Sequence, residues 1–70
     1  MNLKIAPDES FARVYHLYDD KRPLAVILQA LDGNKELAFT VKTLKFNELR
    51  EVYDFVSNYS GWLTDDQWLM

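Results

Sequence analysis

The stretch Leu24–Leu31 constrains the fold of this chain more than any other, because it is apolar on both faces of a strand. Gln29 is its only polar residue. A continuous apolar run of this length predicts a strand with both faces buried. Alternation gives two sets of apolar side chains, which are Leu24, Val26, Leu28 and Ala30 on one face and Ala25, Ile27 and Leu31 on the other.

The sequence on either side of this stretch predicts antiparallel neighbours. Asp32–Asn34 contains residues that tolerate positive φ and predicts a tight hairpin. Glu36–Lys42 alternates between apolar and polar residues, as a strand with one face toward water does. Phe11–Tyr18 is rich in aromatic and β-branched residues, and Asn2–Ala6 alternates weakly. We therefore expect a second long strand and a short edge strand before the apolar one.

The hydrophobic period changes to about 3.6 residues in the stretch Thr43–Tyr59, which predicts an amphipathic helix. Ser60 and Gly61 follow it, with the glycine placed for a left-handed C-terminal cap. Beyond them, Thr64 and Gln67 have the spacing of a capping box. The tail is too short to be helical alone, so we expect its tryptophans to dock on a surface.

The predicted fold is α+β, in a single domain that spans residues 1–70. It is an antiparallel meander of three to four strands, followed by one long helix packed on one face and a short aromatic C-terminal tail. Every connection is short, which favours this simple order.

A single helix covers only one face of a sheet, so the two-sided apolar strand leaves a second face to be covered. The tail could fold back over that face, or a partner could cover it, either a second copy or another protein. The candidate partner or dimer contacts are Ala25, Ile27, Leu31, Trp62, Leu63, Trp68 and Leu69.

The residue types that carry most enzyme chemistry are scarce. His16 is the only histidine and there is no cysteine. In a strand, a lone histidine is more often a cross-strand packing partner than a catalytic base. Adjacent acidic residues occur in turns and at a predicted helix start, where they have simpler roles than metal binding. With only two glycines there is no phosphate-binding loop. The sequence predicts no enzyme, no metal site and no cofactor.

The net charge is −3 and the pI is about 4.9, which disfavours nucleic-acid binding. Strands followed by one helix loosely resemble the single-strand-binding coactivators. That resemblance implies a nucleic-acid-binding module as an alternative function, although the basic strands of those proteins are missing here. No apolar run approaches the roughly 20 residues of a membrane span. No secretion signal is visible, and we expect a cytoplasmic protein without membrane contact.

Our first hypothesis is a small regulatory or adaptor protein that acts by protein–protein contact, with a protein partner or as a homodimer. In size and acidity the chain looks like the small inhibitors and accessory proteins that phages and mobile elements encode. The alternatives are the nucleic-acid-binding module and a small subunit or ligand-binding fragment of a larger enzyme.

Overall fold

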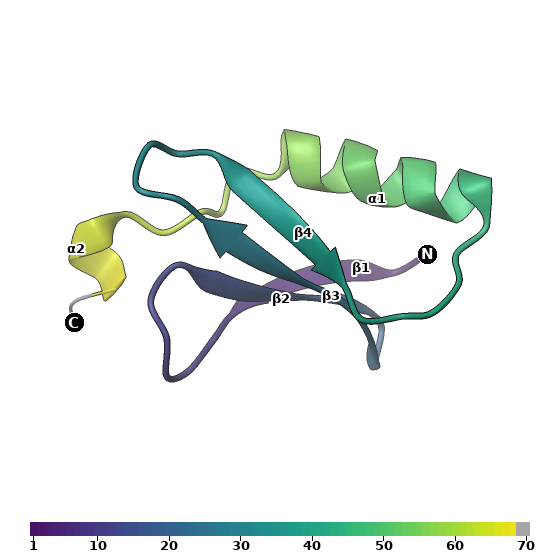
Figure 1. Ribbon diagram of the computed structural model, residues 1–70, viewed down its shortest axis with the longest axis horizontal. Coiled ribbons are helices and arrows are strands. Elements are labelled where there is room, and N and C mark those ends of the chain that lie inside the picture. Colours follow the sequence, from purple (N-terminus) through teal and green to yellow (C-terminus); the bar gives the residue numbers. More distant parts are fainter. Residues whose placement is uncertain (69–70) are drawn as a thin grey trace.

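The computed structural model describes residues 1–68 as a four-stranded antiparallel sheet followed by two helices (Figure 1). The strands lie side by side in chain order, so that each strand pairs with the next, as in a meander. This arrangement confirms the predicted α+β fold. The elements are β1 Leu3–Pro7, β2 Val14–Asp19, β3 Arg22–Gln29, β4 Lys35–Phe39, α1 Phe46–Asn58 and α2 Asp65–Trp68.

The β1–β2 loop is longer than predicted, and β2 begins at Val14 instead of Phe11. The carboxylate of Asp8 accepts the backbone N–H groups of Ser10 and Phe11 at 2.9 and 2.8 Å. These bonds give the loop its own hydrogen-bonded turn, which competes with strand pairing. Arg13 then adopts a positive φ of 63°, which a strand residue does not have.

β3 contains an extra residue relative to β2. Leu17 lies opposite Ala25, but the next residue of β2, Tyr18, lies opposite Pro23. Leu24 therefore has no partner on β2, which is the arrangement of a β-bulge.

The bulge allows Leu24 to face the core together with its neighbour Ala25. Leu24 and Ala25 are consecutive in the chain, yet both are buried, with exposed fractions of 0% and 3%. The predicted grouping of Leu24 with Val26 and Leu28 is therefore wrong, because Leu24 is buried together with Ala25 and Ile27.

The core lies between the sheet and α1, which covers one face of the sheet (Figure 1). Apolar side chains of β1, β4, α1 and the tail surround it. The buried side chains of the core are Tyr15, Leu17, Leu24, Ala25 and Ile27 from the sheet and Val52 from α1.

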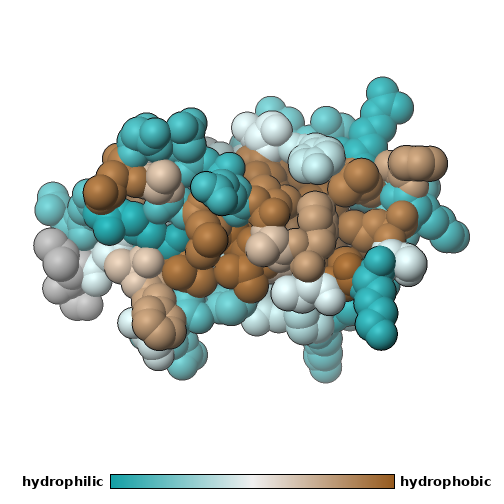
Figure 2. All heavy atoms as spheres, viewed as in Figure 1, coloured by the Kyte–Doolittle hydropathy of each residue, from teal (hydrophilic) through white to brown (hydrophobic). Residues whose placement is uncertain are grey.

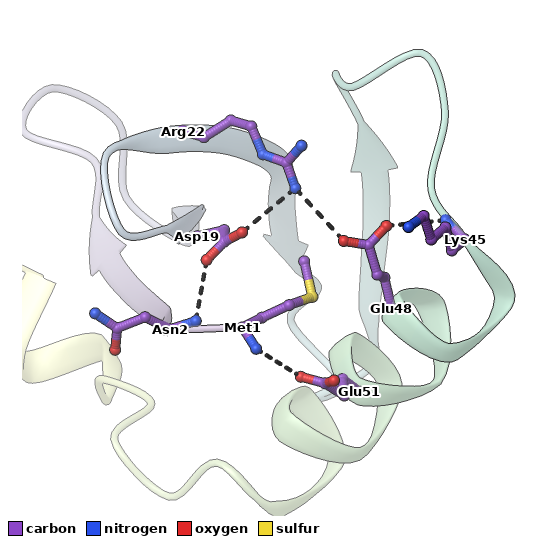
Figure 3. A network of polar contacts seen from close by, with 7 residues as sticks. All are labelled: Met1, Asn2, Asp19, Arg22, Lys45, Glu48 and Glu51. Carbon is purple, nitrogen blue, oxygen red and sulfur yellow. Dashed lines mark hydrogen bonds and ion pairs between the residues drawn. The ribbon is translucent and has the colours of Figure 1, made fainter.

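A polar network joins the first turns of α1 to the strands (Figure 3). Arg22 Nη2 lies 3.4 Å from Asp19 Oδ2 and 4.0 Å from Glu48 Oε2. The amino group of Met1 donates to Glu51 Oε2 at 3.1 Å. The network ties the two residues before β1, the β2–β3 hairpin and α1 together at one end of the sheet.

α1 begins and ends differently from the predicted helix. At its start, Glu48 Oε1 accepts the backbone N–H of Lys45 at 3.0 Å. At its end, the C-cap residue Tyr59 is extended, with φ −69° and ψ 135°, and Gly61 has no positive φ. The predicted left-handed glycine cap is therefore wrong. A Cβ at position 61 would lie 2.5 Å from Tyr59 Oη, so the glycine makes room for the tyrosine ring.

The C-terminal tail docks on Tyr15, on the same face of the sheet as α1. The hydroxyl of Tyr15 donates to Gln29 Oε1 at 2.7 Å and accepts the backbone N–H of Leu63 at 3.0 Å. The rings of Trp62 and Trp68 meet the tyrosine ring edge-on, at centroid distances of 4.9 and 5.3 Å. Edge-on packing is a favoured aromatic geometry.

Two polar contacts hold the short helix α2 in place. Gln67 Oε1 accepts the backbone N–H of Thr64 at 2.7 Å, which is the glutamine half of the predicted capping box. Arg13 Nη2 donates to Asp65 Oδ1 at 2.8 Å. The expected docking of the tail is therefore intramolecular as far as Trp68. Leu69 and Met70 lie outside the described residues.

Candidate protein-interaction surface

The sheet has a second face that neither α1 nor the described tail covers (Figure 1). Ala6 lies opposite His16, His16 opposite Val26, and Val26 opposite Ala38, which makes one row across all four strands. Side chains in such a row lie on the same face of the sheet. We call this surface the open face, and its residues are Lys4, Ala6, Val14, His16, Tyr18, Val26, Leu28, Glu36 and Ala38.

The middle of the open face is apolar. Val14 and Val26 are half-buried by their neighbours, and Leu28 is 44% exposed. The rings of His16 and Tyr18 lie beside them, with their centroids 6.3 Å apart. An aliphatic centre with aromatic residues next to it is typical of surfaces that bind other proteins.

A hollow of about 380 Å³ lies where the open face meets the β1–β2 loop. It brings together a negatively charged loop and two rings of the sheet. Its lining consists of Ala6, Pro7, Asp8, Glu9, Ser10, His16 and Tyr18.

Asp8 and His16 form a close pair in this hollow, with His16 Nε2 2.7 Å from Asp8 Oδ1. The hydrogen bond to His16 and the backbone N–H groups of Ser10 and Phe11 lower the pKa of Asp8 to about 2. Asp8 is therefore ionised at neutral pH and can only accept, so the imidazole N–H is the donor. The pair fixes the orientation of the His16 ring and leaves a negative charge beside the apolar centre.

The predicted contact residues of β3 do not lie on the open face. Ala25 and Ile27 are buried against α1, with exposed fractions of 3% and 0%, so the structure corrects their placement at a partner surface. The register is the physical reason, since Ala25 lies opposite Leu17 and Ile27 opposite Tyr15, on the face that α1 covers. Leu31, the third of these residues, lies in the β3–β4 hairpin and is 83% exposed.

The predicted contact residues of the tail take part in the chain's own packing. Trp62, Leu63 and Trp68 are half-buried and contact Tyr15. Leu69 lies outside the described residues. A further role of the tail in binding a partner stays a prediction.

The sequence did not indicate that His16, Val26 and Leu28 lie together on one surface. The apolar strand signalled that one face would be in surplus, but only the register shows that it is the face with Val26 and Leu28.

In the described part of the chain, no helix has the length and apolar character needed to cross a membrane. Comparison with known proteins finds no matching family model, and no significant match among curated proteins or solved structures.

Proposed function

We propose that this protein is a small non-enzymatic regulatory or adaptor protein that acts by protein–protein contact, and that the open face is its binding surface. The observation that carries the proposal is the uncovered apolar centre around Val26 and Leu28. Both covering elements, α1 and the tail as far as Trp68, lie on the other face. A partner that packs on this centre gains the apolar burial that the chain itself does not supply.

Charge favours a protein over a nucleic acid as the partner. The hollow beside the apolar centre contains Asp8 and Glu9, and Glu36 lies across the sheet. Lys4 is the one lysine or arginine among the residues of the open face. Nucleic-acid sites need the opposite balance, because phosphate contacts supply most of their affinity. The acidic margin suits a partner that is apolar at the centre of its contact surface and basic at the edge.

Two exposed leucines provide a matched test of this proposal. Leu28 lies on the open face, whereas Leu31 lies in the β3–β4 hairpin, away from the sheet. The same substitution, Leu28→Asp or Leu31→Asp, removes the same side chain and adds the same charge. Wild type and both variants would be used as bait for co-purification from the native host, followed by mass spectrometry. Binding would then be measured with the purified partner by calorimetry.

If the proposal is right, a partner protein co-purifies with the wild-type bait and with Leu31→Asp, but not with Leu28→Asp. We expect a dissociation constant at least tenfold higher for Leu28→Asp, because a charge buried at the centre of an interface lacks a partner. Circular dichroism must show that Leu28→Asp is folded. The proposal is contradicted if all three baits retain the partner equally. It is also contradicted if no partner is retained even after chemical cross-linking.

A further inference from the structure

The strand β4 has an open edge. No strand lies beyond it within residues 1–68. The N–H of Thr40 donates to the carbonyl of Leu24 at 2.8 Å, and the N–H of Ala30 donates to the carbonyl of Asn34 at 2.7 Å. Hydrogen-bonded pairs alternate in an antiparallel ladder. The backbone groups that point away from β3 therefore belong to Lys35, Leu37 and Phe39.

The opposite edge of the sheet, at β1, is less able to accept another strand. The N–H of Asp20 donates to the carbonyl of Asn2, and the N–H of Asp8 to the carbonyl of Val14. By the same alternation, Pro7 is one of the residues that face outward, and proline has no N–H to donate. β4 contains no proline, so all its outward-facing residues have a free donor. Strand addition is therefore favoured at β4.

A groove of about 370 Å³ runs beside this edge, between β4 and α1. Figure 2 shows hydrophobic side chains gathered over the middle of the face where β4 and α1 lie. Nζ of Lys35 lies 4.8 Å from the ring centre of Trp62 in this groove. The groove is lined by Lys35, Leu37, Tyr53, Val56, Ser57 and Trp62.

The β4 edge is complementary to a second copy of itself. If two β4 strands pair in antiparallel fashion with Leu37 opposite Leu37, then Phe39 of each copy lies opposite Lys35 of the other. Opposed residues place their side chains on the same face. Phe39 is 36% exposed, and this register places its side chain opposite that of Lys35, which allows a cation–π contact between the ring and the ammonium group. Glu36 then faces Ala38, so no two like charges are opposed.

We propose that two copies of this chain associate through β4, antiparallel and with Leu37 on the two-fold axis, to form one continuous sheet of eight strands, four from each copy. Each contact occurs twice across such an interface. The proposal does not depend on the function of the open face. It has a consequence for that face, since the two open faces join into one longer surface that offers a partner the same site twice.

A charge exchange tests the interface and its register together. Phe39→Lys places two lysines opposite each other at both ends of the paired strands. Adding Lys35→Glu to this variant places a glutamate opposite each lysine instead. Phe46→Lys is the matched control, because Phe46 is 92% exposed at the start of α1 and is not part of β4. The measurement is light scattering over a concentration series, with melting by circular dichroism as a check on folding.

We expect wild type and Phe46→Lys to form dimers. Phe39→Lys should raise the dimer dissociation constant about tenfold or more. The aromatic contact is lost, and a lysine faces a lysine at each end of the paired strands. The double variant should recover most of the dimer. A wild-type protein that is monomeric at all concentrations overturns the proposal. A Phe39→Lys variant that dimerises as wild type does, or a double variant without recovery, also overturns it.

Discussion

Two neighbouring residues of β3 show the difference between the faces of the sheet. Ile27 is completely buried under α1, whereas Leu28 is 44% exposed on the open face. Both are large aliphatic residues in the same strand, so composition does not explain the difference. The covering elements explain it, because α1 and the tail pack on the same face. Within residues 1–68, the chain concentrates its apolar packing on one side of the sheet and leaves the other side open to solvent.

The tail contributes to the covered face although it lies far from it in the sequence. Tyr15 of β2 joins the tail to the sheet through its hydroxyl, which contacts Gln29 and Leu63. The ring of Trp62 is also packed edge-on against Tyr59, 4.8 Å between centroids. The covered face is thus completed by residues nearly fifty positions from Tyr15, which makes its stability depend on the C-terminal segment.

The largest effect should follow from removing the tail. A protein truncated after Gly61 loses Trp62 and Trp68, and the loss of one such side chain costs about 3–5 kcal/mol. That cost is comparable with the whole free energy of unfolding of a domain of this size. We expect the truncated protein to be unfolded or aggregated, as measured by circular dichroism and urea titration.

Tyr15→Phe is the matched control for the truncation, since it keeps the ring contacts and removes only the hydroxyl. It leaves the backbone N–H of Leu63 without its hydrogen-bond acceptor. We therefore expect the free energy of unfolding to fall by about 1–3 kcal/mol. If the truncated protein melts at the temperature of the full chain, the tail does not complete the core and the described docking has no energetic role.

The second prediction compares the two faces directly. Ile27→Ala should lower the free energy of unfolding by about 2–5 kcal/mol, because it opens a cavity in the core. Leu28→Ala removes a partly exposed side chain of similar size and should lower the free energy of unfolding by only about 0.5 kcal/mol. Urea denaturation of the two variants measures the difference. Equal destabilisation would mean that the open face is packed in solution, by a second copy or by a part of the chain.

The sequence was sufficient for the order of the elements, because each type of element has its own hydrophobic period. Glu36–Lys42 and Thr43–Tyr59 illustrate this. The structure places α1 within the second range, and β4 overlaps the first, although it begins one residue earlier at Lys35 and ends at Phe39. The faces of β3 could not be predicted. The bulge at Leu24 reverses the alternation at one residue, and it depends on the pairing with β2 across the sheet.

The open face was likewise only half predictable from the sequence. The apolar run of β3 indicates a surplus of hydrophobic side chains, but not which of them the helix covers. Asp8 and His16 are distant enough in sequence that only the pairing of β1 with β2 brings them together. The predicted meander already placed the last strand at an edge, but the backbone groups that β4 turns away from β3 follow only from the register and hydrogen bonds of the structure.

The smallest effect concerns the β1–β2 loop beside the open face. The hydrogen bond from His16, together with the backbone N–H groups of Ser10 and Phe11, lowers the pKa of Asp8 from 3.8 to about 2. Because the folded-state pKa is the lower one, the stabilisation that Asp8 contributes is complete above about pH 3.8 and is lost as the pH falls through about 2. We expect the amide NMR signals of Ser10 and Phe11 to titrate with a midpoint near pH 2. Asp8→Asn should abolish that titration, while the core signals of Ile27 stay unchanged at neutral pH. A midpoint at the ordinary value of 3.8 would show that the hydrogen bonds of Asp8 are not formed in solution, and that the loop beside the open face is not fixed by them.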